Sequence, residues 1–190
     1  MEIRLFNKQQ ILIKGKKSAV VVDGDDYGKI AKIGGKAWLL TEDGWNKWVK
    51  QSETVLINGP GEYEVGGIEI MGTKIGDDRT GYVVGMDGLT VFACKQLDEE
   101  LSEKKIEKIG GVDIMIVGID GELAAKKVLD LAKKMGANYL IPTSKEAESS
   151  SKMKAFLDEA DCENQEWLES IKIEGELPEG MEVVCLKISA

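Results

Sequence analysis

The hydrophobic pattern of this chain changes its period near residue 98, and this change constrains the fold more than any single motif does. Before that point, apolar residues occur in short runs, some of them alternating with polar residues, which is typical of β-strands. After it, apolar residues recur every three to four positions, as on amphipathic helices, between short and wholly apolar runs typical of buried strands. A strand-rich first half followed by alternating helices and strands predicts two layers of sheet with helices outside.

Turn-forming dipeptides such as Asp87-Gly88 separate the expected strands of the first half. These strands are Glu2–Phe6, Ile11–Lys14, Ala19–Asp23, Ala37–Leu40, Val55–Asn58, Tyr63–Val65, Ile68–Gly72, Gly81–Met86 and Leu89–Cys94. Between two of them, Trp45–Gln51 is expected to form one or two helical turns.

In the second half, helices are predicted over Asp98–Ile109, Gly121–Met135 and Met153–Ala160. Val112–Val117 and Tyr139–Ile141, the latter closed by Pro142, are expected as buried strands. Ile171–Ile173 and Met181–Ile188 resemble a final antiparallel pair. Because no internal repeat or linker interrupts the chain, we expect one domain over residues 1–190.

Composition favours a soluble cytoplasmic protein. With 25 basic and 34 acidic residues, the chain carries a net charge of −9, which argues against binding nucleic acid or an anionic membrane. No apolar run approaches the roughly 18 residues of a membrane span, and the first six residues are too polar for a signal peptide. Three cysteines, none in a CxxC pair, fit reduced thiols better than a disulfide framework.

The chain contains no histidine at all. Zinc hydrolases hold their metal largely through neutral imidazoles, and most serine or cysteine hydrolases use an imidazole as general base. A chain without histidine therefore uses other chemistry or performs none.

Several segments nevertheless resemble a hydrolase family. The most specific is Asn58–Ile68, which reads NGPGEYEVGGI, and Ala19–Gly24, Leu101–Ile114 and Ile141-Pro142 support it. They are similar to the metallo-β-lactamase superfamily, in particular to a small branch of Zn-dependent hydrolases. The resemblance covers most of residues 1–142. It implies an α+β fold, a four-layer αββα sandwich of two mixed β-sheets with helices outside, and a site at one edge between the sheets.

The resemblance fails at each position where that family places a metal ligand. In the loop that begins at Thr41, the expected histidines and aspartate have become Glu42, Gly44, Asn46 and Lys47. An earlier histidine of the family aligns with Lys8, and another aligns near Gly76, just before Asp77-Asp78. The family's Gly-Asp pair, which bridges the metals, aligns with Lys95-Gln96. The family's last histidine aligns with Ser144. The degenerate pocket is thus expected to comprise Lys8, Glu42, Asp43, Asn46, Lys47, Asp77, Asp78, Gln96 and Ser144.

The oxygens of this set could suit a hard cation such as Mg²⁺ or Mn²⁺. Lys47, Lys95 and Lys8 would point at the same place, however, and an ammonium group repels a dication. We therefore interpret the lysines as charge replacements, for example in a Lys47–Glu42 ion pair, and expect neither metal nor other cofactor. Cys94 beside Lys95 could be a nucleophile, although buried strand cysteines are usually inert packing.

Three functional hypotheses remain. The leading one is a non-catalytic member of the fold that acts as a binding or structural module, as a homo-oligomer or as the partner of an active relative. The second is a metal-dependent hydrolase with a site rebuilt from carboxylates around Mg²⁺ or Mn²⁺. The third is a small-anion sensor that uses the vacated pocket through Lys47, Lys95 and Lys145.

Overall fold

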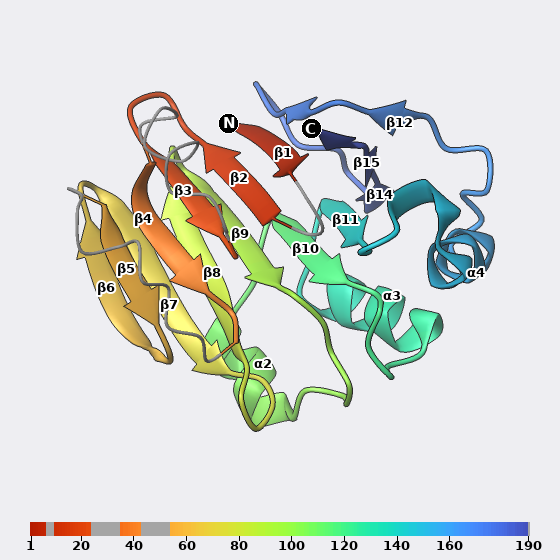
Figure 1. The fold of residues 1–190 in the computed structure, drawn as a ribbon, viewed down its shortest axis with the longest axis horizontal. Coiled ribbons are helices and arrows are strands. Elements are labelled where there is room, and N and C mark those ends of the chain that lie inside the picture. The colour runs from red at the N-terminus through yellow and green to blue at the C-terminus, as the bar shows by residue number, and fades with distance from the viewer. Residues whose placement is uncertain (7–9, 24–34, 43–53, 190) are drawn as a thin grey trace.

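The computed structural model shows two large β-sheets packed face to face, with helices on the outer face of one of them (Figure 1). It describes residues 1–6, 10–23, 35–42 and 54–189. The predicted α+β class, the two mixed sheets and their sandwich arrangement are confirmed.

The first sheet has seven strands in the order β13-β1-β2-β3-β4-β5, with β16 also pairing with β1. β1, β2 and β3 are antiparallel to one another, whereas β3, β4 and β5 are parallel. Their bounds are β1 Glu2–Phe6, β2 Gln10–Lys14, β3 Ala19–Val22, β4 Gly35–Leu40, β5 Val55–Asn58, β13 Ile171–Lys172 and β16 Ile188–Ser189.

The second sheet also has seven strands, in the order β14-β11-β10-β9-β8-β7-β6. It is antiparallel from β6 to β9 and parallel from β9 through β10 and β11 to β14. Their bounds are β6 Gly61–Val65, β7 Ile68–Lys74, β8 Thr80–Met86, β9 Leu89–Cys94, β10 Ile114–Gly118, β11 Tyr139–Thr143 and β14 Glu182–Val183.

Two tight turns fix the register of the antiparallel half of this sheet. Gly66 and Gly67 join β6 to β7 with φ of 61° and 82°, and Asp87 and Gly88 join β8 to β9 with φ of 56° and 80°. Two successive residues with positive φ form the type of hairpin turn whose twist matches that of the strands. The prediction of a hairpin at Asp87-Gly88 is therefore confirmed.

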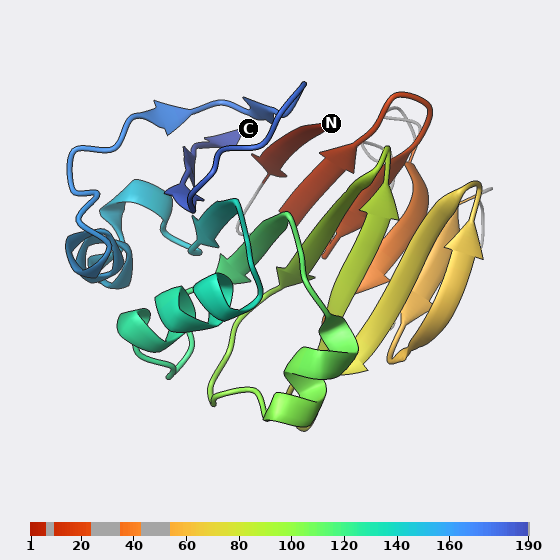
Figure 2. The same cartoon turned by 180° about the vertical axis from the view of Figure 1, so that it is seen from behind.

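The helices α2 (Glu103–Ile109), α3 (Ala125–Lys134) and α4 (Ser151–Glu159) lie against the outer face of the second sheet (Figure 2). A 3₁₀ turn at Ala147–Ser149 precedes α4. On α3 the residues Val128, Leu129, Leu131 and Ala132 are buried. This side is the amphipathic face that the 3.6-residue period predicted.

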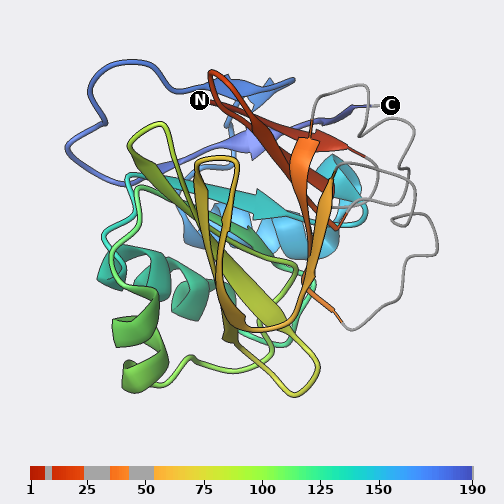
Figure 3. The same ribbon diagram turned by 90° about the vertical axis from the view of Figure 1, so that its left-hand side faces the viewer.

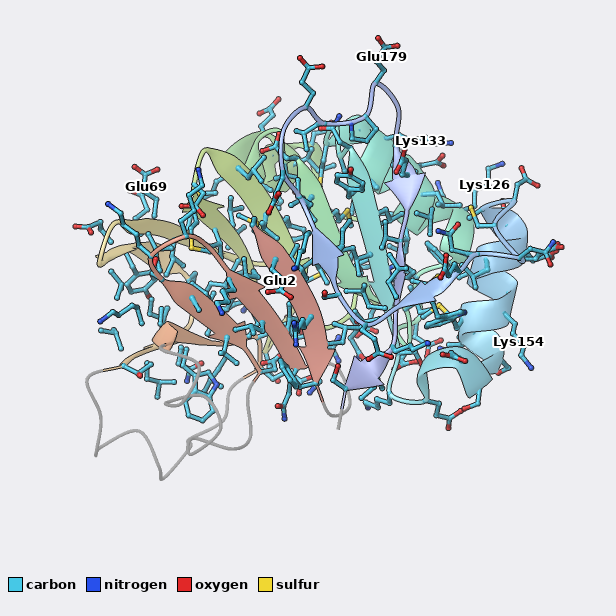
Figure 4. All side chains as sticks on the ribbon, turned by 90° about the horizontal axis from the view of Figure 1, so that it is seen from above. Glu2, Glu69, Lys126, Lys133, Lys154 and Glu179 are labelled. Atoms are coloured by element: carbon cyan, nitrogen blue, oxygen red, sulfur yellow. The ribbon has the colours of Figure 1, made fainter. Side chains whose placement is uncertain are left out.

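Apolar side chains from the inner faces of both sheets form the central core. Ile13 and Val20 of the first sheet pack in one cluster with Val84 and Ile116 of the second. Figure 3 shows the layers from the side, with the second sheet between the first sheet and helices α2 and α3. Charged side chains on the outside, such as Glu69, Lys126, Lys133, Lys154 and Glu179, point into solvent (Figure 4).

The prediction for the C-terminal strands is wrong. Ile171–Lys172 pairs with β1 of the first sheet, while Glu182–Val183 extends the second sheet beside β11. β12 (Trp167–Leu168) and β15 (Cys185–Leu186) form a small parallel pair. These segments are two residues long, too short for their pattern to identify a partner strand across the fold.

Three predicted boundaries also shift. α2 begins at Glu103, after its N-cap residue Ser102, and not near Asp98. α3 begins at Ala125 and not near Gly121. β11 continues through Pro142 to Thr143. Proline is tolerated there because β14 pairs only with Tyr139 and Leu140, so Pro142 lies beyond the end of β14.

On its outer face, the first sheet carries a separate buried cluster of Leu12, Ala19, Val21, Trp38 and Leu40. The helical turns expected over Trp45–Gln51 lie outside the described residues. Within the described ranges, no helix has the length and apolar character needed to cross a bilayer.

Candidate functional site

The candidate site lies at the edge where the strand ends of both sheets meet. Thr41 and Glu42 follow β4 of the first sheet, and Lys95 and Gln96 follow β9 of the second. The sheets touch here through the backbone, because Thr80 N–H donates to the Thr41 carbonyl at 2.8 Å and Glu42 forms a β-bridge with Arg79. The resemblance placed the site at this edge.

Asp23 holds the Thr41 backbone in place. Its carboxylate accepts hydrogen bonds from the Thr41 N–H at 2.8 Å and from the Thr41 hydroxyl at 2.5 Å, and its own N–H donates to the Leu39 carbonyl. Burial raises the pKa of Asp23, which the two hydrogen bonds from Thr41 partly oppose. This buried acceptor fixes where the chain leaves β4 and so positions Glu42.

Tyr82 on β8 is a second link between the sheets. Its side chain is fully buried, and its hydroxyl donates to the Leu40 carbonyl at 2.8 Å and accepts from Gly59 N–H at 3.0 Å. Burial raises the pKa of Tyr82 to about 12, so the phenol remains a neutral hydrogen-bond donor at neutral pH. The bond to Gly59 gives the Asn58–Ile68 segment a structural role.

Five side chains at this edge form what we call the ionic cluster: Glu42, Arg79, Lys95, Gln96 and Asp98. Lys95 Nζ donates to Glu42 Oε2 at 2.7 Å, and Arg79 Nε lies 3.5 Å from Glu42 Oε1. Arg79 Nη1 donates to Asp98 Oδ2. With its amide oxygen turned toward Arg79, Gln96 accepts from Nη2 at 2.6 Å.

The cluster keeps both of its carboxylates ionised. Partial burial raises the pKa of Glu42, but the hydrogen bond and charge of Lys95 and the charge of Arg79 outweigh this and bring it below its usual value. The hydrogen bond from Arg79 likewise lowers the pKa of Asp98. Both carboxylates are thus charged at neutral pH and paired with protein cations.

A cavity of about 590 Å³ opens beside the cluster. Its charged lining is mostly acidic, with five carboxylate residues and one guanidinium. The lining residues are Glu42, Ile75, Gly76, Asp77, Asp78, Arg79, Gln96, Asp98 and Glu99. An acidic wall repels small anions, so the cavity gives the anion-sensor hypothesis no support.

The structure brings together four of the residues predicted from the sequence, since Glu42, Asp77, Asp78 and Gln96 all line this cavity. Ser144 follows β11 at the same edge but does not line it, and its hydroxyl donates to Asp120 at 2.7 Å. Lys8, Asp43, Asn46 and Lys47 lie outside the described residues, and so does the proposed Lys47–Glu42 ion pair.

Sequence reasoning missed Arg79, Asp98 and Asp23 as site residues. Arg79 directly follows Asp77-Asp78 in the sequence, and a basic residue next to an acidic pair was the signal that could have identified it as a site residue. Asp98 was assigned to a helix that in fact begins later, at Glu103. Asp23 matched a family segment, but only its contacts with Thr41 reveal its role.

Zinc does not fit the residues present. The chain has no histidine, and the described residues contain no group of three cysteine, aspartate or glutamate side chains placed to hold a metal. Glu42 and Asp98, two of the carboxylates that line the cavity, already pair with Lys95 and Arg79. The part of this edge that the structure describes therefore lacks the donor chemistry of a zinc hydrolase.

Cys94 is not a nucleophile in this structure. It is completely buried at the end of β9, and burial, with a smaller contribution from the charge of Asp23, raises the pKa of its thiol well above the usual range. A buried and protonated thiol is unreactive. Cys94 packs in the core with Phe92 and Met115.

Comparison with known proteins agrees with this architecture. The family model of the beta-lactamase superfamily domain matches residues 39–144, more than half of the chain. The chain therefore belongs to the β-lactamase superfamily. No functionally curated protein sequence matches it.

Solved structures show the same fold at low sequence identity. A protein from Thermotoga maritima, assigned as a Zn-dependent hydrolase of the metallo-β-lactamase superfamily, matches with a TM-score of 0.82 at 19% identity over 99% of both chains. YhfI from Bacillus subtilis, a metallo-β-lactamase fold protein, matches with a TM-score of 0.65 at 11% identity, over 97% of this chain and 95% of its own.

The metallo hydrolase Igni18 from Ignicoccus hospitalis matches with a TM-score of 0.61 at 12% identity, over 86% of this chain and 90% of its own. At these identities the likenesses establish the metallo-β-lactamase fold. They do not extend to the reaction, which depends on the site.

Proposed function

We propose that this chain is a non-catalytic member of the metallo-β-lactamase fold that serves as a cytoplasmic binding or structural module. The observation that carries the proposal is the ionic cluster. Glu42 stands at a position aligned with a metal-binding histidine, and Lys95 stands in the segment aligned with the metal-bridging pair. In this protein the two side chains form an ion pair of 2.7 Å. In a hydrolase of this fold, the position of Glu42 and the aspartate position, here Gln96, would hold the metal, whereas here Lys95 pairs its ammonium group with Glu42 and Gln96 contributes an amide.

A carboxylate-based hydrolase is the second candidate. The exposed Asp77 and Asp78 line the cavity and form no ion pair with another described residue, so their oxygens favour a hard cation over an anionic ligand. This candidate requires an Mg²⁺ or Mn²⁺ ion held largely by Asp77 and Asp78, because Glu42 is already paired with Lys95.

Metal content and turnover test the two candidates against each other. Untagged protein is purified, its metals are measured by elemental mass spectrometry, and phosphodiester, lactone and β-lactam substrates are assayed with Mg²⁺, Mn²⁺ or Zn²⁺. We expect substoichiometric metal and no turnover above the blank, while a zinc hydrolase of the same fold, assayed in parallel, is active. Turnover that disappears in Glu42→Gln or Asp78→Asn would overturn the proposal.

A module of this kind acts through a partner, and we propose either a second copy of the chain or an active relative. Light scattering coupled to size exclusion, over a range of concentrations, distinguishes the two. A dimer mass supports self-association, whereas a monomer at every concentration would leave the active relative as the proposed partner.

A further inference from the structure

We infer that Lys95 and Arg79 together serve as the resident cation of this site and crosslink the two sheets in the way that a bound metal would. The inference rests on the proposed function, because it assumes that no metal-dependent reaction uses this edge. It goes beyond the loss of ligands by assigning what took the place of the metal.

The charges of the ionic cluster balance. One ammonium and one guanidinium supply two positive charges, equal to those of a divalent ion, and Glu42 and Asp98 supply two negative charges. Each oxygen of Glu42 faces a different cation, with Oε2 at 2.7 Å from Lys95 and Oε1 at 3.5 Å from Arg79. Glu42 is thus held between two cations.

The cluster also joins the same parts of the fold that the site edge brings together. Glu42 follows β4 of the first sheet, whereas Arg79 precedes β8 and Lys95 follows β9 of the second. Arg79 reaches further to Asp98 and Gln96, on the segment that leads away from β9. Three chain segments are therefore tied at one point, and the ties cross from one sheet to the other.

Partial burial makes these ion pairs more than surface contacts. The side chains of Lys95 and Arg79 are 24% and 25% exposed, whereas those of Glu42 and Asp98 are 41% and 42% exposed, so the cations are the more buried partners. Fully exposed ion pairs contribute little, but a network whose cations are partly buried and whose partners are shared is screened less by solvent. Removing one member leaves the others near an uncompensated charge, so the members should be energetically coupled.

A double-mutant cycle on Glu42→Gln and Lys95→Met tests the inference by thermal melting. We expect each single variant to melt about 2–4 °C below the wild type, and the double variant to melt no lower than the worse single variant. Glu100→Gln and Lys127→Met provide the matched control. That pair has an N···O distance of 3.0 Å but is 64% and 49% exposed, so its variants should change melting by less than about 1 °C.

Chelator and salt provide two further measurements on the same proteins. The melting temperature of the wild type should not change with EDTA, and about 1 M NaCl should narrow the gap between wild type and Glu42→Gln, because salt screens charges. Strictly additive effects in the cycle would overturn the inference, and so would a wild-type melting temperature that falls in EDTA or rises with Mg²⁺, Mn²⁺ or Zn²⁺.

The two proposals fail in different ways. An additive cycle together with absent turnover removes the crosslink but leaves the non-catalytic function intact. Metal-dependent turnover removes the proposed function, whatever the cycle gives.

Discussion

At the scale of single residues, this protein closes the gap between its sheets with hydrogen bonds as well as charges. Tyr82 is the clearest case, because one buried hydroxyl serves two backbone groups on segments outside its own sheet. Removing the hydroxyl takes one hydrogen-bond partner away from each of these groups. A buried polar group without a partner costs more than the net worth of the hydrogen bond that it had made.

We therefore predict that Tyr82→Phe lowers the free energy of unfolding by about 1–3 kcal/mol, measured by urea denaturation. Tyr63→Phe is the control, because its hydroxyl lies 3.4 Å from the Gly59 and Pro60 carbonyls on a half-exposed side chain. We expect it to cost less than about 0.5 kcal/mol. Equal losses in the two variants would show that the Tyr82 hydroxyl does not link the sheets.

At the scale of elements, the Gly66-Gly67 turn decides the register of β6 against β7. Both residues have positive φ, and a Cβ at Gly67 would meet no heavy atom within 4 Å. Glycine is therefore favoured at position 67 by its backbone conformation and not by the space available for a side chain. For an L-residue the left-handed region costs about 1–2 kcal/mol, and asparagine tolerates it best.

This contrast gives a prediction with a built-in control. Gly67→Ala should lower the free energy of unfolding by about 1–2 kcal/mol, whereas Gly66→Asn should be nearly neutral, because Asn-Gly is a preferred sequence for this type of turn. Urea denaturation measures both variants. A neutral Gly67→Ala would mean that the turn adopts another backbone conformation in solution.

The same elements show how far the sequence predicts this fold. Period and turn residues located β6 to β9 to within two residues at each end, because a two-residue hairpin leaves a single register. The partner of Ile171–Lys172 could not be predicted, because it is β1, some 170 residues earlier in the chain. Local pattern carries no information about such distant pairing.

The candidate site was predictable in the same uneven way. Alignment with the family placed Glu42 and Gln96 at one edge, and both line the same cavity in the structure, because strand ends fix those positions. It did not give Arg79 as the side chain between Glu42 and Asp98, since that role depends on contacts between three separate segments. The partners of long charged side chains depend on which segments the fold brings together, and the spacing of these residues in the sequence does not indicate those partners.

At the scale of the whole molecule, the ionic cluster makes stability depend on pH in a defined direction. The pKa of Glu42 lies below its ordinary value of 4.5 and that of Asp98 below its ordinary 3.8. A carboxylate whose pKa is lowered by folding contributes stability that is full above its unfolded pKa and is lost as pH falls through the folded pKa. Asp23 acts in the opposite sense, because its pKa is raised.

Wild type and Glu42→Gln share every other titrating group, so their difference reports the charge of Glu42 together with its smaller effect on the pKa of Asp23. We predict that the wild type melts higher at about pH 7, and that the gap closes as pH falls below the ordinary pKa of 4.5, where protonation of Glu42 removes its charge. Melting curves at half-unit pH steps measure the gap. Lys95→Met should show the same convergence with the wild type, because it removes the other half of the pair. A gap that stays constant down to about pH 3 would mean that Glu42 stabilises the fold by packing rather than by charge, and the two sheets would then be linked at this edge by contacts such as those of the Tyr82 hydroxyl with the Leu40 carbonyl and of the Thr80 N–H with the Thr41 carbonyl.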